Sequence, residues 1–204
     1  MDMYTSFAEF SAAEREGIDF LVRVMRRENA LTVVLAPHGG GIEPGTSEVA
    51  SKIADDDLSL AIFEGKKSTD NARLHITSTN FDEPRCLELV LAADYVIAVH
   101  GEGSEEPVVF LGGRDTELGA QLHKALERYG YNVKVHGNPD LQGIATANIC
   151  NRGRRGVGVQ LELTSGLRKT FFQSLTAAGR RKPTDELAKF ACTVREGLRT
   201  AGAL

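Results

Sequence analysis

Short apolar runs rich in β-branched residues alternate along the chain with segments whose apolar residues recur every three or four positions. The first pattern is typical of buried strands, and the second is typical of helices with one apolar face. Strands are therefore predicted over residues 31–35, 58–64, 73–77, 95–100, 108–111, 132–135 and 157–163. Helices are predicted over residues 11–16, 46–54, 83–91, 116–129 and 184–198, with loops or helical turns over 141–150.

Residues 18–24 fit two assignments. Apolar residues at the even positions favour a strand, and a turn at 27–29 would join that strand to 31–35 as a β-hairpin. Leu21 and Met25 instead extend an apolar face at helical spacing, so a helix over 13–27 is the alternative.

The alternation of strands and helices predicts an α/β sandwich with helices on both faces of the sheet. A hairpin near the start and a short connection between residues 64 and 74 favour a mixed sheet over a purely parallel one. Since no linker-like stretch divides the chain, residues 1–204 are expected to form a single domain.

Composition narrows the function classes. The 204 residues are 42% hydrophobic and 25% charged, as in ordinary globular proteins, and the net charge is −4. This charge offers nothing that attracts nucleic acid or an anionic membrane, so neither is expected as a partner. Three cysteines without a CxxC pair, and no signal-like or membrane-spanning run, lead us to expect a cytoplasmic protein.

The loop after the strand at 31–35 carries the first chemical signal. It reads Ala-Pro-His-Gly-Gly-Gly-Ile-Glu-Pro-Gly at 36–45, with His38 and Glu43 among glycines that let the backbone come close to something. An imidazole and a carboxylate are two of the three protein ligands that a catalytic zinc site needs. The alternative is an ordinary glycine-rich turn with a solvated carboxylate.

Two further strand ends carry polar residues. His100 ends the most apolar strand, and Glu162 lies on a strand whose alternation places it on one face with Gln160. Because ligand sites of open α/β sheets gather at the carboxyl ends of strands, His100 is predicted as the third zinc ligand and Glu162 as the general base. Alone, His100 would suit a buried structural histidine, and Glu162 a solvated edge-strand glutamate.

The main basic and polar cluster contains Asn148, Asn151, Arg152, Arg154 and Arg155. Guanidinium groups bind carboxylates through two parallel hydrogen bonds, so this cluster is predicted to bind an acidic substrate. A solvated basic loop is the alternative. His75 is predicted to orient the substrate or to support a metal ligand.

The remaining basic runs, 168–169 and 180–182, are predicted to be solvated. The sequence has neither a phosphate-binding P-loop nor a GxGxxG motif after a strand, so nucleotide chemistry lacks support.

The motif Ala-Pro-His-Gly-Gly-Gly-Ile-Glu-Pro-Gly-Thr-Ser-Glu at 36–48 resembles the poly-γ-glutamate hydrolase family of phages and bacteria. Further pieces match in order: Leu-His-Ile-Thr-Ser at 74–78, Val-His-Gly at 99–101, Asn-Ile-Cys-Asn-Arg at 148–152 and Gly-Val-Gln-Leu-Glu-Leu at 158–163. The resemblance covers nearly the whole chain. It implies a compact relative of zinc carboxypeptidases, a three-layer sandwich built on a mixed sheet.

The resemblance implies that His38, Glu43 and His100 hold Zn²⁺, that Glu162 is the general base, and that Asn151 and Arg152 meet a substrate carboxylate. One departure is the spacing of the first two ligands, because four residues separate His38 from Glu43, whereas zinc carboxypeptidases have two.

The implied function is zinc-dependent hydrolysis of γ-glutamyl amide bonds in poly-γ-glutamate. Separately, we expect a monomer that host lysis would release if a phage encodes it. Two alternatives stay open. One is a zinc amidase or deacylase acting on a small N-acyl amino acid. The other is a non-catalytic, metal-stabilised module that binds acidic polymers.

Overall fold

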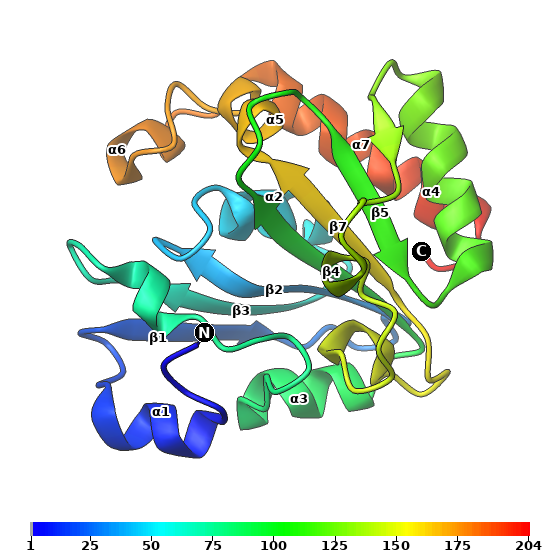
Figure 1. The fold of residues 1–204 in the computed structure, drawn as a ribbon. Coiled ribbons are helices and arrows are strands. Elements are labelled where there is room, and N and C mark those ends of the chain that lie inside the picture. The colour runs from blue at the N-terminus through cyan, green and yellow to red at the C-terminus, as the bar shows by residue number, and fades with distance from the viewer. Residues whose placement is uncertain (1) are drawn as a thin grey trace.

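The computed structural model describes residues 2–204, within which seven strands form one sheet in the order β1-β3-β2-β4-β7-β5-β6 (Figure 1). The strands are β1 (Phe20–Met25), β2 (Thr32–Gly40), β3 (Ser59–Gly65), β4 (Tyr95–Glu102), β5 (Val109–Gly113), β6 (Val133–Lys134) and β7 (Val159–Thr164). β2, β3, β4 and β7 run parallel, whereas β1 and β5 run antiparallel to their neighbours β3 and β7. This confirms the predicted mixed sheet.

Helices cover both faces of the sheet, as predicted (Figure 1). They are α1 (Phe7–Ala13), α2 (Thr46–Ala54), α3 (Pro84–Leu91), α4 (Thr116–Arg128), α5 (Ser165–Thr170), α6 (Ala177–Arg180) and α7 (Asp185–Thr200). Single 3₁₀ turns occupy Asn71–Leu74, Pro139–Leu141 and Ile149–Asn151. The first helix begins earlier than predicted, at Phe7, because the Ser6 side chain accepts a hydrogen bond from the amide of Glu9 and so caps it.

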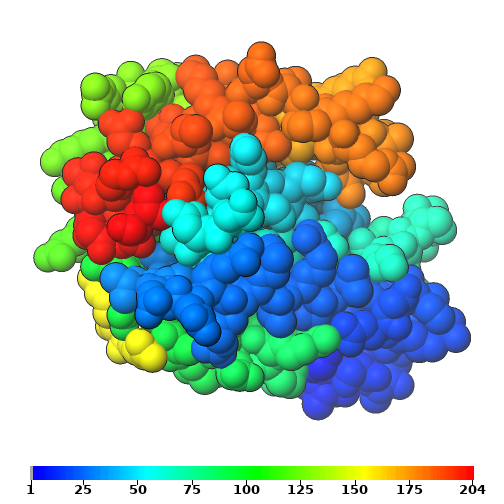
Figure 2. All heavy atoms as spheres, turned by 180° about the vertical axis from the view of Figure 1, so that it is seen from behind, coloured from blue at the N-terminus to red at the C-terminus, as the bar shows by residue number. Residues whose placement is uncertain are grey.

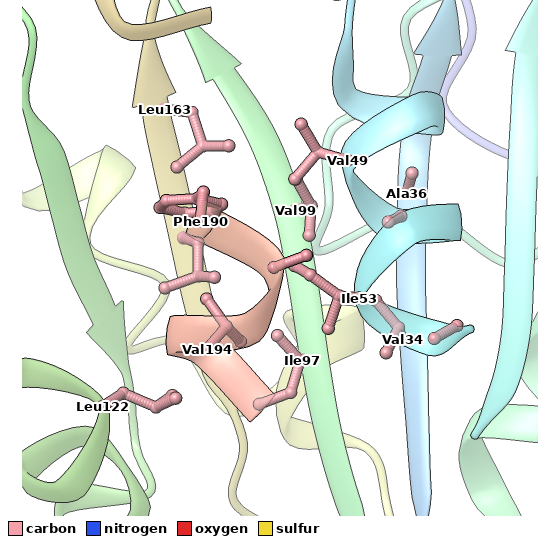
Figure 3. Packing of buried hydrophobic residues seen from close by; sticks show 14 of the residues in the cluster. Val34, Ala36, Val49, Ile53, Ile97, Val99, Leu122, Leu163, Phe190 and Val194 are labelled. Atoms are coloured by element: carbon pink, nitrogen blue, oxygen red, sulfur yellow. The ribbon is translucent and has the colours of Figure 1, made fainter. Parts of the chain in front are cut away.

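The larger apolar cluster lies between the sheet and helices α2, α4 and α7 (Figure 3). Ile97 and Val99 of β4 and Leu163 of β7 point toward these helices, where Ile53 of α2 and Phe190 of α7 meet them. All five side chains are fully buried, so this face of the sheet is held by close apolar packing.

The opposite face carries a second apolar cluster beneath α1 and α3. Its aromatic centre joins Phe10 of α1 to Phe20 of β1 and Phe63 of β3, with ring centroids 4.9 and 5.2 Å from Phe10. Val96 and Ala98, at the beginning and middle of β4, belong to the same cluster. The next residue on this face is His100, so the apolar packing stops where the polar site begins.

The predicted hairpin between β1 and β2 does not form, because β3 lies between them. β2 is buried along its whole length, whereas β1 ends in exposed Val24 and Met25. A strand covered on both faces belongs in the middle of a sheet with a neighbour on each side, and a half-exposed strand suits its edge. The strand assignment at 18–24 was therefore right, and the pairing was wrong.

The strand predicted over residues 73–77 is also wrong. A 3₁₀ turn (Asn71–Leu74) and an irregular segment occupy this region. Leu74 and Ile76 are both buried in the second apolar cluster, so their alternation reflects burial of every other side chain without strand pairing. The segment instead lies against the end of β2, where the Ile76 carbonyl oxygen accepts a hydrogen bond from His38.

From behind, the C-terminal helix, in orange and red, lies above the cyan and blue segments of the first third of the chain (Figure 2). Arg195 of α7 ties these parts together by donating to the carbonyl oxygen of Ile53 at the end of α2, over 2.8 Å. Among residues 2–204, no helix combines the length and the apolar character needed to cross a membrane.

Candidate active site

Three parallel strands bring the predicted residues to one edge of the sheet. β2, β4 and β7 are neighbours and point the same way, so their carboxyl ends meet. His38 lies at a break in the pairing register of β2, and His100 of β4 is paired directly with Glu162 of β7. Residues far apart in sequence thereby converge, as the strand-end rule for α/β sheets predicts.

The loop that carries Glu43 folds back tightly onto His38. The Glu43 amide donates to the His38 carbonyl oxygen over 2.8 Å. Gly40 has a positive φ of 66°, and a Cβ there would lie 2.4 Å from the carbonyl oxygen of Gly65. The close approach of β3 therefore requires a glycine at this position.

Ligand atoms of His38, Glu43 and His100 face one another across short distances. His38 Nδ1 lies 3.1 Å from Glu43 Oε1 and 3.1 Å from His100 Nδ1, and His100 Nδ1 lies 3.7 Å from Glu43 Oε2. Tetrahedral zinc with bonds of about 2.0–2.1 Å sets its ligand atoms about 3.3 Å apart. The three side chains thus have the chemistry and spacing of a three-ligand zinc site.

Hydrogen bonds outside this triad aim its atoms inward. His38 Nε2 donates to the Ile76 carbonyl oxygen over 2.8 Å, so Nδ1 is the ring nitrogen that faces Glu43. The Gly101 amide donates to Glu43 Oε2 over 2.8 Å. Ligand atoms that converge in this way can be bridged by a cation. A histidine that binds a metal usually donates its other ring N–H to a group such as a backbone carbonyl oxygen.

His75 offers a further ligand atom beside the triad. Its ring centroid is 3.9 Å from that of His38, and one of its nitrogens lies within 4.8 Å of ligand atoms of His38 and Glu43. The other side of the ring is held by Asp2, whose carboxylate lies 2.9 Å from His75 Nδ1 and also accepts from the Thr77 amide. Burial lowers the pKa of His75, which favours the neutral form that binds metals.

Two groups of the triad, Glu43 and His100, have shifted pKa values. Burial raises the pKa of Glu43, but the adjacent His38 and His100 outweigh it, and the net pKa lies well below the usual range. Burial lowers the pKa of His100, but the carboxylates of Glu162 and Glu43 raise it more. The lowered pKa keeps Glu43 ionised, which is the form of a carboxylate that binds a cation.

Glu162 lies beside the triad with its side chain only 5% exposed. Burial raises its pKa to about 7, although His100 acts in the opposite direction. Gln160 Nε2 donates to Glu162 Oε1 over 2.9 Å, and Asn148 in turn donates to Gln160 over 3.0 Å. A carboxyl group that titrates near neutrality, held by a chain of amides, can accept and return a proton at physiological pH.

All these groups open onto one cavity of about 390 Å³. His38, Glu43, His75, His100, Asn148 and Glu162 line it, with Thr77, Ser78 and Thr79 on one wall. A larger hollow of about 500 Å³ beside Tyr95 and Arg155 contains none of these residues. The cavity at the strand ends is therefore the candidate active site, because convergent polar groups and shifted pKa values matter more than size.

Residues 4–193 match the sequence family described as poly-gamma-glutamate hydrolase. The chain belongs to the poly-γ-glutamate hydrolase family.

Two proteins of similar sequence come from Bacillus subtilis strain 168. The UPF0714 protein YndL is 39% identical over 172 residues, which cover 84% of this chain and 67% of YndL. The SPbeta prophage-derived UPF0714 protein YoqZ is 36% identical over 181 residues, which cover 88% of this chain and 65% of YoqZ.

Two solved structures share the fold almost completely. A bacteriophage poly-gamma-glutamate hydrolase superposes with a TM-score of 0.92 at 31% identity, covering 98% of both chains. A structure described as zinc-free apo YNDL gives a TM-score of 0.91 at 34% identity, covering 98% of this chain and 99% of that one.

The structure places some of the residues predicted to bind substrate in the cavity and others outside it. His75 and Asn148 line the cavity. Asn151 does not, because its buried amide is used by the backbone of Gly143, Ala145 and Gly158. Their substrate-binding role stays a prediction, and position favours it only for the first two.

The two arginines predicted to bind substrate also lie outside the cavity lining. Arg152 directs one guanidinium nitrogen at the Phe81 carbonyl oxygen, over 3.4 Å. Arg154 lies 3.6 Å from Asp94, just before the amino end of β4 and so at the end of that strand opposite to His100. Both have the right chemistry for a carboxylate, but their positions do not support the predicted role.

Sequence reasoning missed two residues that the structure brings to the site. Arg168 was expected to be solvated, but its side chain is buried and tied to backbone carbonyl groups. Asp2 reaches His75 from 73 positions away. Neither residue has a local pattern that sets it apart, because both contacts depend on how distant segments pack.

Proposed function

We propose that this chain is a zinc-dependent hydrolase that cleaves γ-glutamyl amide bonds of poly-γ-glutamate. The observation that carries the proposal is the convergence of His38 Nδ1, His100 Nδ1 and the Glu43 carboxylate within 3.1–3.7 Å, in a cavity that Glu162 shares. Membership of the hydrolase family and the zinc-free description of the YNDL structure support the choice of metal and substrate.

His38, Glu43 and His100 would hold the cation, as the three protein ligands of a catalytic zinc site do. A zinc ion held there polarises the amide carbonyl group of the substrate and makes water more acidic. The carboxylate of Glu43 and two neutral imidazoles give a ligand set with a single negative charge. The metal and its three ligands would therefore carry one net positive charge, which attracts a carboxylate of the substrate.

Glu162 performs the proton transfers. In its ionised form it accepts a proton from the water that attacks the amide carbon, and it then returns that proton to the departing nitrogen as the carbon–nitrogen bond breaks. Its raised pKa of about 7 suits both halves of this exchange. Gln160 keeps the carboxyl group oriented between the two steps through the hydrogen bond to Oε1.

Neutral donors would orient the substrate. His75 and Asn148 line the cavity, together with the hydroxyl groups of Thr77 and Ser78. Side chains of this kind hydrogen-bond a glutamyl carboxylate or the amide backbone of the polymer without filling the cavity with fixed charge.

The test is the chain length of purified poly-γ-glutamate, followed by gel filtration after incubation with the protein. Pre-treatment with a chelator should stop cleavage, and added Zn²⁺ should restore it, while Mg²⁺ should not, because nitrogen ligands favour zinc. Cleavage that continues at the same rate in the chelated protein would contradict the zinc mechanism.

The substrate is tested in parallel. Zinc-loaded protein is offered the polymer and small N-acyl glutamates at equal concentrations of amide bonds. We expect faster turnover of the polymer, because remote parts of a long substrate contribute binding energy that a small one lacks. A preference for the small compounds would replace the polymer hydrolase with a small-molecule amidase.

A further inference from the structure

A buried arginine lies directly behind the candidate metal site. Arg168 belongs to α5, the short helix that follows β7, and its side chain is 5% exposed. Its Nε donates to the Leu163 carbonyl oxygen over 3.0 Å, Nη1 to that of Pro44 over 2.5 Å, and Nη2 to that of Glu102 over 2.8 Å. One guanidinium group thus joins three separate stretches of backbone.

These three carbonyl groups share a position relative to the site. Pro44 immediately follows the ligand Glu43, and Leu163 immediately follows Glu162. Glu102 is two residues after the ligand His100. The loop after β2 and the carboxyl ends of β4 and β7 are therefore pinned to one planar group at the points where they present the functional side chains. A lysine ammonium lacks the rigid fork that reaches three such acceptors.

The packing around the guanidinium group shows how closely it approaches the ligands. A Cβ at Gly101 would lie 2.8 Å from Arg168 Cζ and 2.9 Å from Glu43 Cβ. Gly101 is also the residue whose amide donates to Glu43 Oε2. Only a bare backbone fits between the arginine and the ligand, so movement of the guanidinium group is transmitted directly to Glu43.

Filling this space with the charged side chain of Arg168 costs folding free energy. Within residues 2–204 its hydrogen bonds go to carbonyl groups, and the carboxylates of Glu43, Glu102 and Glu162 act on it only through their charge. Burial of a charge without a directly paired carboxylate disfavours folding, and an apolar side chain of similar size would fill the space at lower cost. The charged guanidinium group is therefore explained by the three backbone segments that it holds together.

We propose that Arg168 is a positioning residue that fixes Glu43, His100 and Glu162 relative to one another, and so sets the affinity of the site for its metal and the rate of the proton transfers. This role rests on the proposed zinc site, and it goes beyond that site by making a residue that touches neither metal nor substrate part of the machinery.

The test compares Arg168→Lys and Arg168→Met with Lys169→Met as the matched control. Lys169 is the next residue on the same helix, but it is exposed and pairs with Glu105. For each variant, circular dichroism reports folding, competition with a chelating dye gives the Kd for Zn²⁺, and the visible absorption of the Co²⁺-substituted protein reports the geometry around the metal. Polymer cleavage gives kcat and KM.

We expect Arg168→Lys to fold, to bind Zn²⁺ about 10- to 100-fold more weakly and to have an altered Co²⁺ spectrum. Its kcat should fall about 10-fold or more, with little change in KM, because substrate contacts stay in place. Arg168→Met should show larger losses, and Lys169→Met should match the wild type in every measurement.

A folded Arg168→Lys protein with wild-type Kd, Co²⁺ spectrum and kcat would overturn the positioning role while leaving the zinc site intact. Failure of the wild type and of Lys169→Met to bind Zn²⁺ would instead overturn the proposed function, and the positioning role with it.

A measurement on the wild type covers the case in which neither arginine variant folds. Coupling between two sites is reciprocal, so a metal that depends on Arg168 must also tighten the hydrogen bonds of Arg168. Guanidinium exchange, followed by NMR in protein labelled with ¹⁵N-arginine, should slow about 10-fold for Arg168 on addition of Zn²⁺. Unchanged exchange would contradict the proposal.

Discussion

The two faces of β7 place side chains in opposite environments. Leu161 and Leu163 point into the apolar cluster beneath α7, whereas Gln160 and Glu162 point into the cavity. Successive side chains of a strand alternate, so an offset of one residue separates packing from chemistry. The same alternation in β4 places Val99 in the core and His100 in the site. In both strands the polar side chains of the site are confined to one face, so the opposite face remains apolar.

The two faces also contribute to stability with opposite sign. Burial of the leucines removes apolar surface from water and favours folding. Burial of Glu162 disfavours its charged form, as the raised pKa of about 7 shows. The following changes break or sharpen this contrast, in order of decreasing expected effect.

Glu162→Gln should abolish most of the activity, because the amide cannot accept a proton from water. We expect kcat to fall about 100- to 10,000-fold, the usual range for removal of a general base. Binding of Zn²⁺ should be retained, since the variant leaves all three ligands in place. Polymer cleavage and a Zn²⁺ titration on the same preparation measure the two quantities, and a variant with near-normal kcat would remove Glu162 from the mechanism.

Phe190→Ala tests the opposite face. The ring is fully buried in the apolar cluster, with its centroid 5.0 Å from that of Phe171 and 5.2 Å from that of Tyr131. Its removal should lower the free energy of unfolding by about 3–5 kcal/mol, through lost burial and the cavity left behind. Urea unfolding measures this loss. Activity per folded molecule should persist, and its disappearance in folded protein would mean that the two faces are coupled.

Glu162→Gln should also change stability, in a direction that depends on pH. In the zinc-free protein the folded pKa of about 7 lies above the usual glutamate value of 4.5, so the native state binds more protons between these values. The destabilisation by ionised Glu162 is therefore absent below about pH 4.5, grows as the pH rises, and is complete above about pH 7.

The variant lacks this ionisation, so it should be more stable than the wild type by about 1–3 kcal/mol at pH 8. Near pH 5 the difference should almost vanish. Urea unfolding of chelated proteins at both pH values checks this expectation. A variant less stable than the wild type at pH 8 would show that the carboxylate is favoured where it lies.

Arg154→Ala should have the smallest effect. The side chain is 61% exposed, and its partner Asp94 is 3.6 Å away, so the pair should contribute less than about 0.5 kcal/mol to stability. The variant should also keep kcat/KM within about twofold, because Arg154 lies outside the cavity. Asn148→Ala is the matched comparison inside the cavity, where loss of the hydrogen bond to Gln160 should lower kcat/KM about 10-fold. A large effect of Arg154→Ala alone would support its predicted contact with substrate.

The sequence predicts those parts of the fold and site that depend on local pattern. Strand positions follow from short apolar runs, and the side chains brought together at the cavity follow from the rule that parallel strands end at one edge. The neighbour of each strand in the sheet is harder to predict. Residues 18–24 were assigned correctly as a strand, but the choice of β3 over β2 as its neighbour depends on which strand must be buried on both faces.

The basic residues show that residue type alone does not predict position. Arg152 and Arg154 look suited to an acidic substrate, yet they lie outside the cavity, while Arg168 looks like one more solvated cation. Its burial is created by three carbonyl groups that are distant from one another in the sequence. No local signal reports such a contact, because it exists only after the strands have been assembled.

The tight backbone turn at Gly40 determines how far the loop must rearrange when a metal binds. Since β3 already fixes the course of this loop, His38 and Glu43 are brought face to face by the sheet itself and need no ion to gather them. Loading should therefore leave the main chain almost unmoved and sacrifice little chain entropy. The zinc-free and zinc-bound proteins should superpose closely throughout residues 38–43.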